Sequence, residues 1–399
     1  MSEWEERKIN SLCKRICSGG TPMSTNHQFY GGSIPWLRTN EVDFCRIEDT
    51  EIKITQKGLD SSSAQWIPKN TVIVAMYGAT AAKSAIAKIR LTTNQACCNL
   101  IIDESMADYR FIFYALKLAY EPLRLLAVGG AQQNLNSATI RNFKVCAPDL
   151  PVQTRIADIL SAYDDAIENS NRRIALLEKA AQELYKEWFV RFRFPGHENT
   201  KFINGLPEDW EYKSVGVIAY VNPSLYTTEN KNEEILYIDI ASVKNGRLDS
   251  YTQLLFSEAP SRARRKIKAF DTIYSTVRPN LRAYRFIVSC PSNAVVSTGF
   301  SVVRSKNSFD SLFIYHTLTE DKAVEYFSQI ATGTSYPAIV GKDIKRHKVL
   351  LPAESLREKF WEMISPFYKE IDKLEYQSQN LARQRDLLLP RLMSGKLEV

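Results

Sequence analysis

A heptad repeat through residues 151–191 constrains the fold of this chain more than any other feature. Apolar or small residues recur there at alternating spacings of four and three, and neither glycine nor proline occurs after Pro151. These residues are Ile156, Leu160, Tyr163, Ile167, Ser170, Ile174, Leu177, Ala181, Leu184 and Trp188. Such a repeat predicts a helix about 50 Å long, at roughly 1.5 Å per residue, that packs along one partner helix.

A second copy of the pattern lies 204 residues further along the chain, which is the spacing from Ile156 to Phe360. Eight of its ten positions are apolar. The ten positions are Phe360, Ile364, Phe367, Ile371, Leu374, Ser378, Leu381, Arg385, Leu388 and Leu392. One copy alone fits an ordinary bundle helix. Two copies in the same register favour a chain of two halves, each a globular block followed by a long helix.

Length and composition are those of a folded protein with several domains. The 399 residues suggest two to four domains, and a hydrophobic content of 44% supports packed cores. No apolar run reaches the length of a membrane span and no leader pattern opens the chain, so we expect a cytoplasmic protein without membrane contact. The seven cysteines and four histidines form no zinc-binding spacing, so we expect no metal or other cofactor. A net charge of +7 weakly favours a polyanionic partner.

The two blocks repeat one order of expected elements. In the first block, residues 34–38, 71–77 and 93–102 have the pattern of strands. Residues 235–239 and 271–276 of the second block match the first two at offsets of 201 and 200, and residues 293–300 take the place of the third. The spacing inside the blocks drifts by a few residues, whereas the long helices share one offset. The pattern therefore predicts one repeated frame with two different interiors.

Several motifs in this order resemble the specificity subunit of type I restriction-modification systems, and the resemblance covers essentially the whole chain. The first group is Gly20-Thr21-Pro22, Gly32-Ser33-Ile34-Pro35-Trp36, Met76-Tyr77-Gly78-Ala79-Thr80 and Thr93-Asn94-Gln95-Ala96. The second group is Lys186-Glu187-Trp188-Phe189-Val190-Arg191-Phe192-Arg193-Phe194-Pro195-Gly196, Ser275-Thr276-Val277-Arg278-Pro279-Asn280-Leu281-Arg282 and Leu388-Leu389-Pro390-Arg391-Leu392-Met393-Ser394-Gly395-Lys396.

The resemblance implies a mixed α/β (α+β) protein with two target-recognition domains in tandem. We place these domains at residues 1–149 and 195–354, and two long spacer helices at residues 150–194 and 355–399. Each domain is expected to read one half of a split site in double-stranded DNA. The helices are expected to dock two methyltransferase (M) subunits, and restriction/translocase (R) subunits join for cleavage. The chain itself is then a non-catalytic component.

A split DNA site needs one block at each end of the paired helices, so we expect the two helices to pair antiparallel. The chain path also favours this sense, because the second block lies between the helices in sequence and can span from the end of one to the start of the other. If the pairing is centred near residues 172 and 376, Trp188 faces Phe360 and Tyr163 faces Arg385. The Arg385 guanidinium must then lie over the tyrosine ring or reach solvent.

The densest group of cations lies in the second block, where Arg262, Arg264, Arg265, Lys266 and Lys268 place five cations within seven residues. Such density suits contacts with DNA phosphates, which fix position without reading sequence. A solvated loop or strand edge is the alternative interpretation.

Further candidates for DNA contact lie in polar loops and where strands end. Arginine can bond guanine through two hydrogen bonds, and asparagine or glutamine can bond adenine in the same way. The candidates of the first block are Arg38, Asn40, Tyr77, Lys83, Gln132, Gln133 and Asn134, and those of the second are Thr276, Arg278, Asn280, Arg282, Ser335 and Tyr336. For each residue, loop capping or ordinary hydrogen bonding is the alternative.

Two segments only partly match catalytic motifs. Residues 222–226 (NPSLY) lack the second proline and adjacent aromatic residue of adenine methyltransferases. Residues 78–84 (GATAAKS) lack the second glycine of a phosphate-binding loop. A self-contained DNA methyltransferase or nuclease would need a methyl-donor loop or an acidic metal cluster, and we find neither. The remaining alternative is a coiled-coil scaffold that does not bind DNA, which leaves the basic run unexplained.

Overall fold

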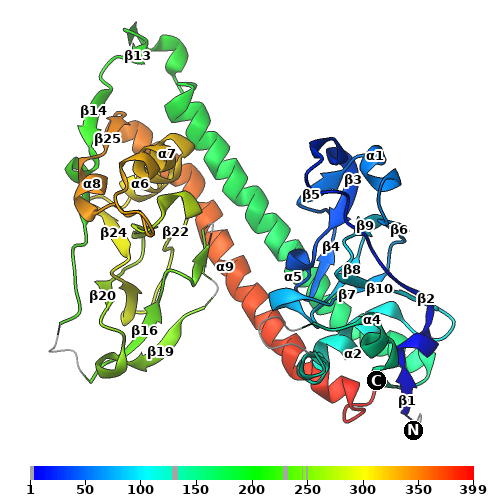
Figure 1. The fold of residues 1–399 in the computed structure, drawn as a ribbon. Helices are drawn as coiled ribbons and strands as arrows, with labels where there is room; N and C mark the ends of the chain where they lie inside the picture. Colours follow the sequence, from blue (N-terminus) through cyan, green and yellow to red (C-terminus); the bar gives the residue numbers. More distant parts are fainter. Residues whose placement is uncertain (1–3, 128–133, 228–231, 245, 249) are drawn as a thin grey trace. The chain divides into compact units, whose positions relative to one another are not determined.

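The computed structural model describes residues 4–127, 134–227, 232–244, 246–248 and 250–399. The chain divides into two compact units. The first consists of Met1–Glu168 and Ser378–Val399, and the second of Asn169–Gln377. Each of the two long helices contributes residues to both units (Figure 1).

The first unit contains two mixed sheets and a short β-ribbon. One sheet has the order β2 (Cys13–Ser18), β10 (Cys97–Ile102), β7 (Val72–Ala75), β8 (Ser84–Ala87) and β4 (Cys45–Ile47). The other has the order β5 (Ile52–Ile54), β3 (Tyr30–Leu37), β9 (Leu91–Thr93) and β6 (Trp66–Ile67). The ribbon pairs β1 (Glu5–Lys8) with β11 (Lys144–Ala147). The helices of the first unit, apart from the long helices, are α1 (Gln56–Asp60), α2 (Tyr109–Leu118), α3 (Tyr120–Leu125) and α4 (Ser137–Asn142).

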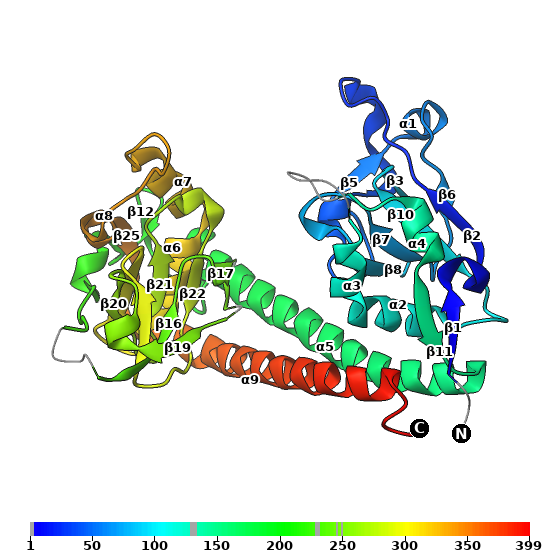
Figure 2. The ribbon, with the colours of Figure 1, turned by 60° about the horizontal axis from the view of Figure 1, so that its bottom comes forward.

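The second unit repeats this strand order. One sheet is β15 (Ala219–Val221), β24 (Phe300–Ser305), β21 (Thr272–Ser275) and β22 (Tyr284–Phe286). The other is β19 (Thr252–Leu255), β16 (Glu234–Ile238), β23 (Ala294–Ser297) and β20 (Ala263–Lys266). The ribbon pairs β14 (Glu211–Ser214) with β25 (Lys348–Leu351), and two hairpins pair β12 (Phe202–Ile203) with β13 (Leu206–Pro207) and β17 (Val243–Lys244) with β18 (Arg247–Leu248). Its helices are α6 (Asp310–Thr319), α7 (Asp321–Ile330) and α8 (Gly341–Arg346) (Figure 2).

The strand order also repeats inside the two units, where the spacing of the sequence drifts. In both, the central pair of one sheet is parallel, β3 with β9 and β16 with β23, and the remaining pairs of that sheet are antiparallel. The first sheet gains β4, which pairs with β8, whereas the corresponding sheet of the second unit ends at β22 among the described residues. The drift in spacing therefore lies in the connections, and the strand order is conserved.

Strand β7, at residues 72–75, is buried on both faces, which explains why its sequence is apolar without alternation. Val72 and Val74 face a core that also contains Phe111 of α2, whereas Ile73 and Ala75 belong to a core with Leu37 and Leu91 of the other sheet. A strand that is covered on both faces has no polar side. In the second unit Ile273 and Tyr274 divide between two cores in the same way.

The predicted single strand at residues 93–102 is wrong in one respect, and so is its counterpart at residues 293–300. Each run leaves one sheet and enters the other, because a turn separates β9 from β10 and β23 from β24. At the second turn, the Thr298 N–H donates to the Arg262 carbonyl and the Thr276 N–H to the Gly299 carbonyl (2.7 and 2.8 Å). One stretch of chain thus ties the two sheets of each unit together.

The two long helices confirm the predicted heptad seam. Helix α5 covers Leu150–Tyr185 and continues as a π-helical turn, Lys186–Val190, while α9 covers Glu354–Met393. All twenty predicted seam positions are buried or half-buried. In the second unit the rings of Trp188 and Phe360 lie 5.8 Å apart, as predicted, and Arg173 forms an ion pair with Glu370 (2.7 Å). The helices pack antiparallel, because the residue earlier in α5, Arg173, contacts the residue later in α9, Glu370, and the later Trp188 contacts the earlier Phe360.

One predicted layer needs correction. The Arg385 guanidinium does not depend on the Tyr163 ring or on solvent, because it forms ion pairs with Asp164 and Asp386 in the first unit. Asp164 also accepts a hydrogen bond from the Tyr114 hydroxyl of α2 (2.5 Å). The heptad pattern could not reveal this partner, because Asp164 lies beside the seam and α2 belongs to the globular part of the unit.

Candidate nucleic-acid interface

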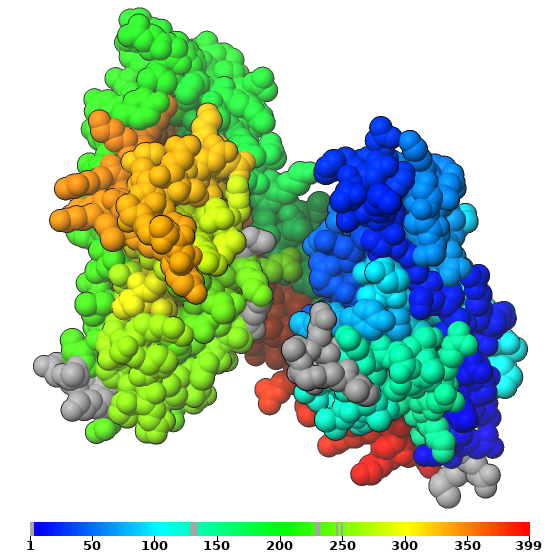
Figure 3. Space-filling model, viewed as in Figure 1, coloured from blue at the N-terminus to red at the C-terminus, as the bar shows by residue number. Residues whose placement is uncertain are grey.

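A pocket of about 510 Å³ in the second unit brings together three of the predicted DNA-contacting residues. Arg262 precedes β20, Arg278 follows β21, and Tyr336 lies in the segment after α7. That segment, drawn in gold to orange, lies at the surface of the unit (Figure 3). Strand ends that are far apart in sequence therefore form one basic and aromatic concavity.

Arg278 is held in an uncommon backbone conformation at the edge of this pocket. Its φ is +48°, in the left-handed region that non-glycine residues seldom occupy. Its N–H donates to the Pro337 carbonyl (2.8 Å), and its guanidinium donates to the Ser335 carbonyl (2.8 Å) and lies 4.7 Å from the centre of the Tyr336 ring. The side chain is exposed yet oriented, as a residue that reads a base needs to be.

Two cations of the basic run on β20 lie against an aromatic shelf, which consists of the rings of Phe256 and Tyr226. The Arg264 guanidinium lies 4.6 Å from the Phe256 ring centre, and the Lys266 ammonium lies 4.1 Å from the Tyr226 ring centre. The two rings are themselves 5.2 Å apart. Cation–π contacts of this kind hold long side chains in place without neutralising them. These two cations are thereby oriented and remain charged for contact with an anion.

Two members of the predicted set point into the protein. The Arg265 guanidinium donates to the Phe300 carbonyl, and burial lowers the pKa of its side chain. Thr276 is buried, and its hydroxyl donates to the Gly299 carbonyl (2.8 Å). Both side chains hold the turn between the two sheets, which is a structural use that their position next to exposed cations did not reveal.

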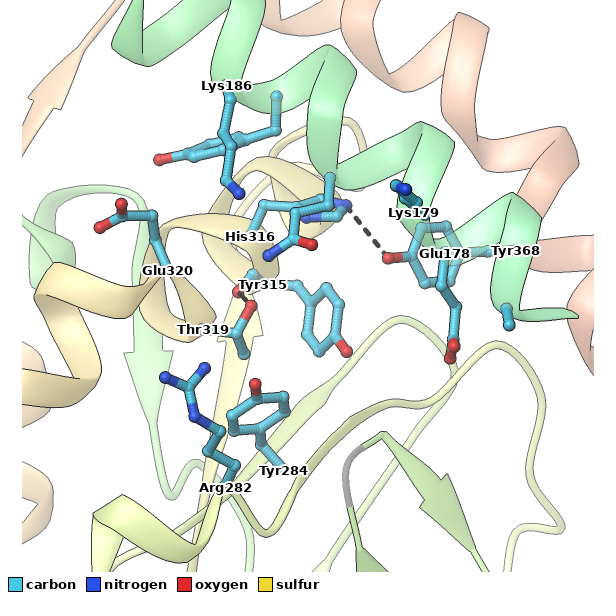
Figure 4. A pocket seen from close by; sticks show the side chains of 13 residues that line it. Glu178, Lys179, Lys186, Arg282, Tyr284, Tyr315, His316, Thr319, Glu320 and Tyr368 are labelled. Atoms are coloured by element: carbon cyan, nitrogen blue, oxygen red, sulfur yellow. Dashed lines mark hydrogen bonds between the residues drawn. The ribbon is translucent and has the colours of Figure 1, made fainter. Parts of the chain in front are cut away.

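Arg282 is separated from Arg278 although only three residues lie between them. It donates to Asp321 of α7 (2.6 Å) and lines a second pocket, of about 370 Å³, between α5, α6 and β22 (Figure 4). On the inner wall of that pocket, His316 and the Tyr368 hydroxyl form a hydrogen bond (3.0 Å), and burial lowers the pKa of His316 to about 3. Arg282 thus has a carboxylate partner, whereas the described partners of the Arg278 guanidinium are a carbonyl and a ring.

The remaining candidates of the second unit are exposed. Asn280 lies in the turn after Arg278, Ser335 precedes Tyr336, and Lys268 follows β20. Tyr336 itself is 69% exposed. All four are accessible to a large ligand.

The first unit places its candidates on the same strand ends. Tyr77 follows β7, is 40% exposed, and forms an isolated β-bridge with Asn134, which is also exposed. Exposed Asn40 lies in the turn after β3. Gln132 and Gln133 lie outside the described residues.

Two cations of the first unit already have carboxylate partners. Arg38 forms an ion pair with Glu51 (2.7 Å), and its Nε is buried without a hydrogen-bond partner. Lys83 forms an ion pair with Asp43 (2.6 Å). Both pairs are partly exposed, so a phosphate or a base can compete for either cation at modest cost.

Sequence reasoning missed Asp239, which lines the same pocket as Arg262 and Arg278. The signal was present, because the offset of 201 that relates residues 34–38 to residues 235–239 makes Asp239 the counterpart of Arg38. Asp239 also helps to raise the pKa of the Arg262 guanidinium, after the larger effect of the hydrogen bond from Arg262 to the Tyr237 hydroxyl (3.0 Å).

Within the described residues, no group of three or more histidine, cysteine, aspartate or glutamate side chains is arranged to hold a metal ion. In the same residues, no helix has the length and apolarity needed to cross a bilayer.

Comparison with known proteins identifies relatives along the whole chain. The family described as the type I restriction modification DNA specificity domain matches residues 1–179. The type I restriction enzyme MjaIX specificity subunit of Methanocaldococcus jannaschii is 26% identical over 421 residues, which cover 100% of this chain and 94% of that protein. The EcoR124I/EcoR124II specificity subunit of Escherichia coli is 27% identical over 190 residues, which cover 45% of this chain and 46% of that protein.

Among solved structures, the S subunit of a type I restriction-modification system from M. genitalium superposes with a TM-score of 0.62 at 18% identity. The superposition covers 98% of this chain and 96% of that chain. At this identity the likeness demonstrates a common fold, which includes both repeats and both long helices.

Proposed function

We propose that the chain is a specificity subunit of a type I restriction-modification system and that it selects the DNA sequence on which such a complex acts. Each unit reads one half of a split site through its strand-end loops. The long helices connect the two readers. The chain supplies recognition and leaves methyl transfer and cleavage to its partners.

One observation carries this proposal: two units with the same strand order present different side chains at equivalent strand ends. A repeated frame is expected when two modules do the same kind of task, and different surface residues are expected when they read different bases. The pocket with Arg262, Arg278 and Tyr336 supplies the cations and the ring that base and phosphate contacts require.

The partners follow from the family. We propose that the chain binds double-stranded DNA together with two methyltransferase subunits, and that restriction/translocase subunits join that assembly. The long helices offer exposed apolar side chains for docking, such as Leu176 on α5 (61% exposed) and Tyr376 on α9 (67% exposed). A self-contained methyltransferase, a nuclease or a scaffold that does not bind DNA has less support, because the relatives carry the name of specificity subunits.

The test is binding of the full chain to random DNA duplexes on filters, with and without methyltransferase subunits, followed by sequencing of the retained duplexes. We expect a split motif. Replacement of residues 1–149 by the corresponding block of a relative should change one half of that motif only. Retention without any sequence preference, or a change in both halves, would contradict the proposal.

A further inference from the structure

We propose that Asp239 and Arg262 together read one C·G base pair in the half-site of the second unit. This inference rests on the proposed function and adds to it the identity of a base pair and of the two side chains that recognise it. It concerns one edge of the pocket that also contains Arg278 and Tyr336.

One carboxylate oxygen of Asp239 accepts hydrogen bonds from described residues and the other does not. The N–H and the hydroxyl of Ser242 both donate to its Oδ1, each at 2.9 Å. Among the described residues, Oδ2 has no hydrogen-bond or ion-pair partner. Two bonds to one oxygen fix the plane of the carboxylate, so the second oxygen is a preoriented acceptor at the pocket wall.

Arg262 is held in a complementary way. Its Nε donates to the Tyr237 hydroxyl (3.0 Å), and neither terminal nitrogen has a described partner. The side chain is exposed, and its guanidinium lies close enough to Asp239 for the two charges to interact without forming an ion pair. Two adjacent N–H donors are therefore available beside one carboxylate acceptor.

This pattern matches the major-groove edge of a C·G pair. Cytosine presents the N4 amino group as a donor, and its guanine partner presents O6 and N7 as acceptors. Asp239 would accept from N4, and Arg262 would donate to O6 and N7. Adenine also offers an amino group, but its neighbouring N7 would repel the carboxylate, and guanine or thymine would place an acceptor directly against it.

A carboxylate in a DNA-facing pocket needs such a role, because it is repelled by the phosphates around it. The repulsion weakens binding to every sequence, and only a donor at the right position offsets it. Asp239 therefore rejects wrong bases as well as accepting the right one. The equivalent position in the first unit holds Arg38, which has the opposite charge and would favour guanine.

The test uses the full chain with its methyltransferase subunits and a randomised duplex library, for the wild type and for Asp239→Asn and Arg262→Ala. Asparagine can keep the bonds from Ser242 through Oδ1 but turns a donor toward the base. We expect each variant to lose its preference for cytosine and guanine, roughly 5- to 150-fold, at one and the same base pair. The double variant should relax that position and no other.

Glu211→Gln is the matched control, since it removes one negative charge from β14, which does not line the pocket. It should leave the motif unchanged. Thermal melting checks that each variant is folded. An unchanged motif for folded Asp239→Asn, or different relaxed positions for the two variants, would overturn this inference alone. A wild-type complex without any sequence preference would instead overturn the proposed function.

Discussion

The two units of this protein have the same backbone frame, but they differ in what they place on it. At the end of β7 the Leu135 N–H donates to the Met76 carbonyl (2.8 Å), and at the end of β21 the Ile339 N–H donates to the Thr276 carbonyl (2.9 Å). Tyr77 pairs with Asn134, where Val277 pairs with Ala338. The hydrogen bonds are backbone bonds, so the side chains can change without disturbing the frame.

The turn after this strand shows the difference most clearly. Gly78 and Ala82 of the first unit have φ values of +80° and +70°, and Arg278 and Arg282 of the second have +48° and +54°. The turn has one shape, yet it carries no cation at these positions in one unit and two in the other. A left-handed backbone favours glycine, so an arginine at position 278 costs stability and points to a use for its side chain.

The interiors differ as well. Thr71 and Ile101 of the first unit correspond to Asp271 and Arg304 of the second, as the equivalent strand pairings require. Asp271 is fully buried and accepts two hydrogen bonds from Arg304 (2.8 and 2.7 Å) and one from the Lys268 N–H (2.7 Å). At this strand position, Thr71 thus supplies a hydroxyl group in the first unit, whereas Asp271 supplies the carboxylate of a buried ion pair in the second.

The largest effect is expected from a substitution that breaks this ion pair. Asp271→Asn should lower the free energy of unfolding of the second unit by about 3–5 kcal/mol, because Arg304 loses its counter-charge in a largely buried site. Urea unfolding of the full chain measures it.

The double variant Asp271→Thr with Arg304→Ile, which installs the residues of the first unit, should be less destabilised than Asp271→Asn. A double variant that is equally unstable would mean that the two interiors are not interchangeable at these positions.

A smaller effect is expected at the turn. Arg278→Gly installs the residue of the first unit, relieves the left-handed backbone and removes the side chain from the pocket. Specific DNA binding should weaken by about 1–3 kcal/mol while thermal stability is retained, and titration of the selected duplex together with a melting curve measures both. Unchanged affinity in the glycine variant would show that Arg278 contacts no base.

The smallest effect concerns the aromatic shelf. Lys266→Ala should weaken binding to all duplexes alike and reduce the slope of log affinity against log salt by about one, because one phosphate contact is lost. Filter binding over a salt series measures the slope. Lys213→Ala on β14 is the control and should leave the slope unchanged. A selective loss for one sequence would assign base reading to Lys266 instead.

Features of this fold that are local or repeated can be predicted from the sequence. The antiparallel long helices, the strand-turn segments and the correspondence of residues 34–38 with 235–239 all follow from periodicity and offset. The direction of a side chain cannot be predicted where it depends on a neighbouring strand. Arg265 and Thr276 share their segments with exposed candidates, but their side chains point into the protein. A single carboxylate after a strand has no distinguishing pattern by itself, and only the offset of 201 that makes Asp239 the counterpart of Arg38 indicates its position.

The sequence by itself determined that this chain consists of two equivalent blocks and two paired helices, because a heptad seam and a constant offset are properties of residue order alone. Only the tertiary structure decided which strand ends meet. Arg262, Arg278 and Tyr336 become neighbours through β-pairings between segments that are far apart in sequence. Such pairings depend on the packing of whole sheets, which no local pattern encodes.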